Sequence, residues 1–301
     1  GNLPALEAVL KDAGEKCVDS YIFVGDYCLS NPYPNECITL IRELNNKYMI
    51  QGNEEKYLEN LIGKDQSMWT DGQMQISYWC YRRVSSQNLE FLLSCPKQID
   101  FICNGVKLHV AHSSEMYIDD CEHREWGAAK VAQRYAGQTI TKEAFDKDIH
   151  SYFDTDEQFR KHFNDLSEGI YIFGHSHIQW NYVSEDGKKV VVNPGSCGLP
   201  LDCVKGIPYT LIDISTTGEV TVEERRVPFD IEKHIRLLMQ SEQYQMANVW
   251  SKVIMKELRT GREHLTFFLQ FVNAYAEKIG DERRPFAVDT WEKAFEQWSQ
   301  Q

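Results

Sequence analysis

Side chains that could bind a metal ion follow four separate apolar runs of the chain, each directly after a small residue. They belong to the segments Gly25-Asp26, Gly52-Asn53, Ala111-His112 and Gly174-His175-Ser176-His177. Each run reads as a short strand that ends at the small residue. Because ligands bind at the carboxyl ends of strands in open α/β sheets, we expect the five polar side chains to gather in one crevice.

The types of these side chains indicate which ion they would bind. Carboxylate oxygen, amide oxygen and imidazole nitrogen, without thiolate, suit a borderline hard divalent cation, so manganese, iron, zinc and nickel all stay open. One carboxylate beside several neutral ligands suits two cations about 3.5 to 4 Å apart, with Asp26 bridging them. Such a pair lowers the pKa of a bound water toward about 7 and stabilises charge on phosphoryl oxygens. The predicted chemistry is phosphoester hydrolysis.

Each candidate ligand also has an ordinary structural explanation. Asp26 could be a turn carboxylate after a strand, Asn53 a turn residue after glycine, and His112 a core histidine bonded to the backbone. His175 and His177 alternate along the chain, so a plain strand would present only one of them to a site. The repetition of the pattern at four strand ends favours metal binding.

The segments that must position these residues alternate between helix and strand. Asn2 is placed to cap a first helix that stops at Gly14. Asn104-Gly105 is a strong signal for a two-residue hairpin turn. We predict helices at 34–44 and over much of 54–93, a buried strand at 18–24, and further strands at 47–51, 99–104, 107–111, 170–173, 189–192, 209–214 and 219–227. The fold class is therefore α/β.

Two helical stretches lie outside this pattern. Residues 119–168 are polar and charged, and we interpret them as a helical insertion or cap. Beyond Pro228, about four helices end near Trp298. We therefore divide the chain into a domain of residues 1–228 and a C-terminal helical subdomain or tail, 229–301. Trp250, Trp291 and Trp298 could form a homo-oligomer interface, or could equally pack on the chain's own domain.

Composition excludes some classes of partner. The chain has 45 acidic and 32 basic residues and a net charge of -13, which disfavours nucleic acid as the main partner. Its nine cysteines contain no C-x-x-C pair and indicate thiols in a reducing cytoplasm. No stretch approaches the roughly 20 apolar residues that cross a membrane. We expect a cytoplasmic protein that acts on a small phosphorylated substrate.

The four motifs resemble, in order and approximate spacing, those of the calcineurin-like metallophosphoesterases, especially the small bacterial phosphoesterases and phosphodiesterases. The segments Gly1–Glu7, Asn31–Cys37 and Asn193–Ser196 look like further stretches of that family, so the resemblance covers about 1–228. It implies a four-layer α/β/β/α sandwich with a binuclear metal centre. Asp26 would bridge both metals, Asn53, His112 and His175 would complete one metal site, and His177 would join the other, with His112 also assigned to the reaction.

One departure concerns the family's first motif. That motif is an Asp-x-His that stands just before the Gly-Asn matched here by Gly1-Asn2, so two ligands of one metal are missing from this sequence. We expect the gene to encode them upstream of Gly1. An alternative is a catalytically impaired member of the fold that acts as a binding or regulatory module.

A second departure is Glu54, which stands where many members carry a histidine that protonates the leaving group. Glutamate could act as the catalytic acid only if burial or a neighbouring carboxylate such as Glu55 raised its pKa. Without an acid, good leaving groups are favoured. We therefore expect phosphodiester or nucleotide-type substrates.

Overall fold

The computed structural model describes residues 1–300. The first part contains α1 (Leu3–Glu15), β1 (Tyr21–Phe23), α2 (Pro34–Glu43), β2 (Lys47–Met49), α3 (Asn53–Glu59), the short η1 (Gln66–Met68), α4 (Gln75–Arg83) and α5 (Ser86–Ser94). The central part contains β3 (Gln98–Cys103), β4 (Val106–Ala111), α6 (Glu115–Ile118), α7 (His123–Trp126), α8 (Ala128–Arg134), α9 (Lys142–Thr155), α10 (Glu157–Asp165), β5 (Gly169–Ile172), β6 (Gln179–Val183) and β7 (Lys189–Pro194). The last part contains β8 (Ile207–Ile214), β9 (Val220–Val227), α11 (Ile231–Met239), α12 (Glu242–Met246), α13 (Asn248–Thr260), α14 (Leu265–Ile279) and α15 (Val288–Trp298).

A five-stranded sheet forms the centre of the molecule, in the order β3-β4-β5-β7-β6. The pairs β4-β5 and β5-β7 are parallel, while β3 and β6 run antiparallel to their neighbours. The predicted hairpin is confirmed: Asn104 and Gly105 have φ of 47° and 82°, as a tight turn between β3 and β4 requires. Strand β6 was not predicted. The carboxyl ends of β4 and β5 meet at one edge, where they deliver two of the candidate motifs.

Alternate residues of the inner strands face two different cores. Ile170 and Ile172 of β5 pack with Val190 and Val192 of β7 in the core beneath β8 and β9, whereas Tyr171 belongs to the core under the insertion helices. This alternation follows from the two-residue period of a strand. Strands buried on both faces therefore read as continuous apolar runs in the sequence.

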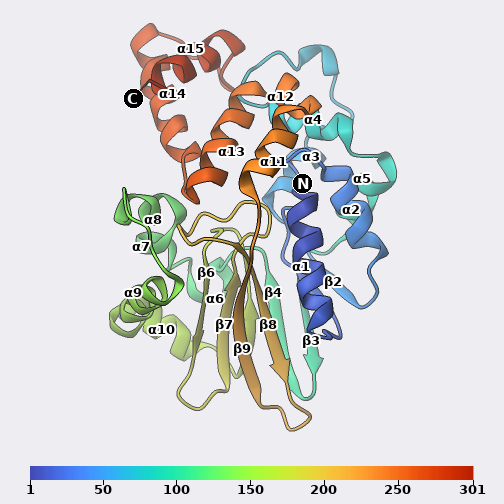
Figure 1. Ribbon diagram of the computed structural model, residues 1–301, viewed down its shortest axis with the longest axis vertical. Coiled ribbons are helices and arrows are strands. Elements are labelled where there is room, and N and C mark those ends of the chain that lie inside the picture. Colours follow the sequence, from blue (N-terminus) through green and yellow to red (C-terminus); the bar gives the residue numbers. More distant parts are fainter. Residues whose placement is uncertain (301) are drawn as a thin grey trace.

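The layers that cover the sheet are visible in Figure 1. Helices α7 to α10 lie on one side of the strands, α1, α2 and α5 on the other, and the β8-β9 ribbon lies in front of the central sheet. The two-stranded sheets β1-β2 and β8-β9 share an apolar core with the central sheet. The predicted mixed α/β fold is confirmed, with helices covering both outer faces.

Strand β1 differs from the prediction of a buried strand at 18–24. It spans only Tyr21–Phe23, and all three residues are half-buried. Among residues 1–300, β1 pairs only with β2, and β8 pairs only with β9. A cavity of about 270 Å³ lies between their open edges under the apolar face of α1, and it reaches Asp26 and His177. Strand β1 is therefore only half-buried because, within residues 1–300, no strand pairs with its second edge.

Residues 229–300 hold five helices, α11 to α15, one more than the predicted number of about four. Trp291 is fully buried in a core of its own, against which Trp250 and Trp298 pack, in line with packing on the chain's own domain. The Trp250 indole N–H donates to the Gln73 carbonyl at 2.7 Å, which attaches this part to the front domain. Among residues 1–300, none of the helices combines the length and apolar character that a membrane span requires.

His234 of α11 makes the second attachment, and its burial predicts a pH dependence. Its Nε2 lies 2.8 Å from Asn31 Oδ1, and the residue is 1% exposed. Burial lowers the pKa of His234 from 6.5 to about 4. In the unfolded chain His234 has its ordinary pKa, so it takes up a proton at a higher pH than in the folded chain. The free energy of unfolding should therefore fall as pH drops from 6.5 toward 4, by up to about 3 kcal/mol.

Urea unfolding between pH 7.5 and 4.5, with a chelator present, measures this contribution. The variant His234→Gln removes the titrating ring and keeps an amide that can donate to Asn31, so its stability should depend less on pH. His162→Gln, at a partly exposed position of α10, serves as the control. An unchanged pH dependence in His234→Gln would show that another group is responsible.

Candidate metal centre

Four of the five predicted ligands converge on one point at the carboxyl ends of the strands. His112 Nε2 lies 3.1 Å from Asp26 Oδ2 and 3.1 Å from Asn53 Oδ1. His175 Nδ1 lies 3.0 Å from the same Asn53 oxygen and 3.3 Å from His112 Nε2. Ligand atoms that share a cation at about 2.0–2.2 Å lie roughly 3.0 to 3.4 Å from one another. The spacing therefore fits a single bound metal ion.

The protonation of His112 explains why these atoms face each other. Its Nδ1 lies 2.6 Å from the Val24 carbonyl and donates to it, which leaves the Nε2 lone pair directed at Asp26 and Asn53. Burial lowers the pKa of His112 and the Asp26 carboxylate raises it, with a net rise. A proton shared with Asp26 can hold the metal-free site together, and a cation can replace it.

His175 stays neutral, as a metal-binding imidazole must. Burial and then the neighbouring His112 lower the pKa of His175 to about 4. A ring with this pKa offers its lone pair over the whole physiological range. The donor set of one carboxylate, one amide and two imidazoles therefore fits a divalent cation in chemistry as well as in spacing.

The loops bend the chain so that both histidines of the last motif face the cleft. Asp26, His175 and His177 have φ of 59°, 64° and 61°, in the left-handed region that non-glycine residues seldom adopt. Strand β5 ends at Ile172, so the alternation of a plain strand does not apply to the two histidines. Such backbone strain persists where the surrounding structure fixes it and is common at functional sites.

His177 stands beside the other four ligands. Its Nδ1 donates to the Leu199 carbonyl at 2.8 Å, which leaves Nε2 free to bind. His177 lines the same cleft as Asp26 and His175. The structure thus brings four predicted ligands to one point and places the fifth next to it.

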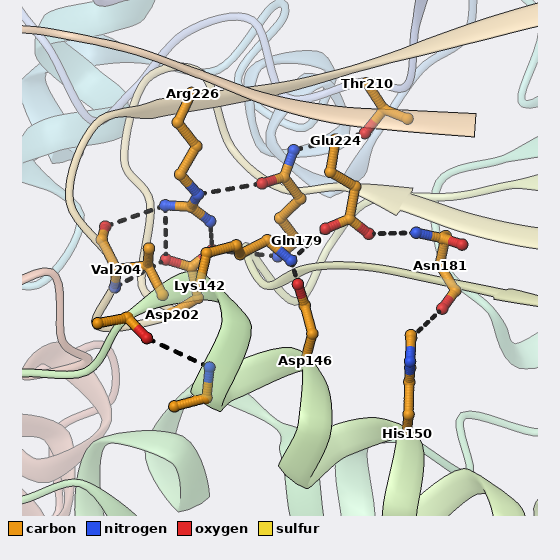
Figure 2. A network of polar contacts seen from close by, with 12 residues as sticks. Lys142, Asp146, His150, Gln179, Asn181, Asp202, Val204, Thr210, Glu224 and Arg226 are labelled. Atoms are coloured by element: carbon orange, nitrogen blue, oxygen red, sulfur yellow. Dashed lines mark hydrogen bonds and ion pairs between the residues drawn. The ribbon is translucent and has the colours of Figure 1, made fainter.

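A buried polar network fixes the segment that carries Leu199 (Figure 2). Arg226 of β9 forms an ion pair with Asp202 and donates to the Val204 carbonyl at 2.9 Å. Asp202 is fully buried and also accepts from the Gln179 backbone N–H at 3.2 Å. In the same view Lys142 of α9 pairs with Asp146 and Glu224, so the network joins the insertion to the sheet. A paired buried charge of this kind holds a loop in one conformation, because separating it is costly.

Two glycines allow the ligand loops to approach each other. A Cβ on Gly25, whose φ is 95°, would lie 2.8 Å from His112 Nδ1. A Cβ on Gly52 would lie 2.8 Å from the Asp26 backbone nitrogen and would also overlap the Asp26 carboxylate. Separations under 3.0 Å force a shift of the backbone or the ligand. Steric exclusion therefore explains why glycine stands directly before Asp26 and before Asn53.

Glu55 connects these two loops, and sequence reasoning missed this role. Its carboxylate accepts the backbone N–H groups of Asp26 at 3.0 Å, Tyr27 at 3.0 Å and Gly52 at 2.7 Å. The side chain is fully buried. A Gly-Asn-Glu-Glu start of a helix is the only sequence signal, since a glutamate at the third helical position often reaches back to the cap. Glu55 is thus a positioning residue for the candidate ligands.

Glu54 lines the cleft beside Asp26. Its backbone N–H donates to Asp26 Oδ1 at 2.9 Å, and its side-chain Oε2 is buried without a hydrogen-bond partner. Burial, Asp26 and Glu55, in that order, raise the pKa of Glu54 well above its usual range. A raised pKa lets the carboxyl group keep its proton to higher pH, which is the condition for an acid role.

A cleft of about 640 Å³ opens from the candidate ligands between the insertion and α13 and α14. His123 of α7 lines it and lies 5.7 Å from His175 between ring centroids. No role was predicted for His123, because an isolated histidine in a polar segment carries no signal. The side chains of Arg83 and Arg124 pair with Glu36 and Asp156.

Comparisons with known proteins agree with this geometry. The chain is 28% identical over 241 residues to an uncharacterised protein of Methanocaldococcus jannaschii, covering 77% of this chain and 85% of the relative. A metallophosphoesterase structure from Sphaerobacter thermophilus aligns with a TM-score of 0.53 at 20% identity, covering 86% of this chain and 95% of that one. A hypothetical protein from Pyrococcus horikoshii aligns with a TM-score of 0.54 at 15% identity, covering 88% and 96%. These two structures show the fold alone.

The family assignment comes from the sequence match over the front domain. Residues 1–217 match the calcineurin-like phosphoesterase superfamily domain, and this range includes all five candidate ligands. The same range contains all of the strands described above except β9. The chain therefore belongs to the calcineurin-like phosphoesterase superfamily, whose members hydrolyse phosphoesters with the help of divalent metals.

Proposed function

We propose that this protein is a phosphoester hydrolase that uses two divalent cations, with phosphodiesters or nucleotide-type molecules as substrates. The observation that carries the proposal is the convergence of acceptor atoms from Asp26, Asn53, His112 and His175 within 3.0 to 3.3 Å of their neighbours. Lone pairs at this spacing repel each other unless a cation or proton lies between them. Membership of the superfamily makes a divalent metal the natural occupant.

The candidate ligands would divide between two neighbouring metal sites. Asp26 Oδ2 faces His112, and Oδ1 accepts the Glu54 backbone N–H. Each oxygen has a further lone pair, so the carboxylate could bridge two neighbouring sites. His177 presents its free Nε2 to the same cleft and would belong to the second site. Bound cations supply a nucleophile at neutral pH and stabilise charge on the phosphoryl oxygens.

The cavity between β1 and β8 supports the position of the second site. It reaches both Asp26 and His177, and open strand edges line it on two sides. An extended segment would fit there as an added strand, because unpaired edges recruit backbone partners. We propose that a strand added at this position carries the two further ligands expected from the family's first motif.

Hydrolysis of an activated aryl phosphodiester and of the matching monoester, measured with and without Mn²⁺, tests the proposed function. Two forms of the protein should be assayed, one that begins at Gly1 and one that carries the upstream extension. We expect turnover that depends on metal, is removed by a chelator and is faster for the diester. Absence of turnover in the extended protein with Mn²⁺, Fe²⁺, Zn²⁺ and Ni²⁺ would contradict the proposal and favour a binding module.

The acid role of Glu54 gives a separate prediction. Glu54→Gln keeps the size of the side chain and removes the proton that a poor leaving group needs. We expect its kcat on an alkyl phosphodiester to fall about 10²-fold, within the usual range for one acid catalyst. The rate on the activated aryl diester should change little, because that leaving group departs without a proton. Equal losses on both substrates would show that Glu54 does not act as the acid.

A further inference from the structure

A second group of metal-ligating side chains lies on the insertion, outside the ligands described above. Asp120, Glu122 and His123 each offer one ligand atom, and these atoms lie within 4.8 Å of one another. They surround the turn between α6 and α7. The Ser114 hydroxyl lies 2.6 Å from Asp120 Oδ1 and 2.6 Å from Glu122 Oε1, so it has a single proton for two carboxylate oxygens.

One oxygen of this group has no partner at all. Glu122 is 1% exposed, and its Oε2 is shielded from solvent without any hydrogen bond. An ionised carboxylate costs several kcal/mol to bury unless it is paired or binds a metal. Burial accordingly raises the pKa of Glu122 in the metal-free chain. The other oxygen of the same carboxylate, Oε1, accepts from Ser114 and lies 3.6 Å from His123 Nε2. The buried carboxylate therefore lacks a partner for one of its two oxygens.

The nearby guanidinium groups are engaged elsewhere. Arg124 donates to Asp156 at 2.8 Å, and Arg134 pairs with Glu125 at 3.5 Å. His123 approaches the two carboxylates only loosely, with Nε2 3.6 Å from Glu122 and Nδ1 3.9 Å from Asp120. Both separations are too long for hydrogen bonds, and they involve different ring nitrogens. An ion among the three groups would therefore bind only one nitrogen of His123, together with one oxygen from each carboxylate.

We propose that Asp120, Glu122 and His123 bind a divalent cation at a site of their own. Two carboxylates and one imidazole suit Mn²⁺, Zn²⁺ or Fe²⁺. The ion would replace the missing partner of Glu122 and fix the turn that carries His123. Because His123 stacks edge-on with His175 and lines the same cleft, the ion adds positive charge on the insertion side of that cleft. Cation binding here does not depend on whether the chain hydrolyses phosphoesters.

Equilibrium dialysis and calorimetry with Mn²⁺, on the chelator-treated full chain, test the site. Glu122→Gln and His123→Ala should each bind one equivalent less than the unaltered protein. Glu125→Gln, an exposed carboxylate on the same helix, is the matched control and should bind the full number. His175→Ala should lose a different equivalent, so that the double variant Glu122→Gln/His175→Ala loses both.

Thermal unfolding keeps the test valid if a variant changes the fold. Glu122→Gln removes a buried unpartnered charge, so the metal-free variant should melt at or above the temperature of the metal-free parent. The rise in melting temperature caused by Mn²⁺ should be smaller in the variant. Unchanged stoichiometry in Glu122→Gln and His123→Ala, or an undiminished rise with metal, would overturn the proposal.

Discussion

Replacing Asp26 by asparagine should lower the metal-dependent hydrolysis rate by roughly 10³-fold, because charge stabilisation by a metal contributes several kcal/mol and each 1.36 kcal/mol is a factor of ten. Asp26 is the sole carboxylate among the four converging ligands, and its Oδ2 lies 3.1 Å from His112 Nε2. An amide in its place carries no charge and binds divalent cations less strongly. The variant should therefore also bind Mn²⁺ more weakly.

The measurement combines kcat on the aryl phosphodiester with a Mn²⁺ titration of the same preparation. Asp100→Asn is a suitable control, since Asp100 lies on β3, has a side chain that is 66% exposed and pairs with His109. The control should keep both the rate and the metal affinity. A parental rate in Asp26→Asn would mean that the reaction occurs elsewhere in the molecule.

Replacing Glu55 by glutamine should cost about 2 kcal/mol of unfolding free energy, although Glu55 touches no substrate. The carboxylate accepts three backbone N–H groups, and a glutamine would place its NH₂ against at least one of them. Burial and the Asp26 charge raise the pKa of Glu55 while the three N–H groups lower it. The hydrogen bonds, rather than a favourable charge, therefore account for the stabilisation.

Metal affinity should fall by 10- to 100-fold in the same variant, a range typical for groups that orient metal ligands. Urea unfolding with a chelator and a Mn²⁺ titration measure the two effects separately. Glu59→Gln, an exposed position at the end of the same helix, is the control. If Glu55→Gln matched this control in both measurements, the loops around Asp26 and Gly52 would be held by other contacts.

Short-range patterns account for the parts that could be predicted. The hairpin at Asn104-Gly105 needs left-handed φ at both positions, which these two residue types accept readily. Residues such as Ile170 and Val190 lie in strands buried on both faces, so their apolar runs were visible in the sequence. The ligands after these runs then followed from the rule that strand ends carry sites.

Features set by distant contacts could not be predicted in this way. The sequence does not show that Glu55 reaches back across a loop to Tyr27, because this depends on how β1 and β2 pair. His123 reaches the cleft only because the insertion packs beside His175. Strand β6 was not predicted because its buried residues are both polar and apolar. Gln179 and Trp180, for example, are adjacent and both fully buried.

Crystals grown with Mn²⁺ and measured at the manganese absorption edge test the convergence of the four ligands most directly. We predict an anomalous peak about 2.0 to 2.3 Å from the ligand atoms of Asp26, Asn53, His112 and His175, at the point toward which their lone pairs are directed. A well-ordered structure with manganese bound at other positions and no peak at this point would contradict the assignment of these residues as metal ligands.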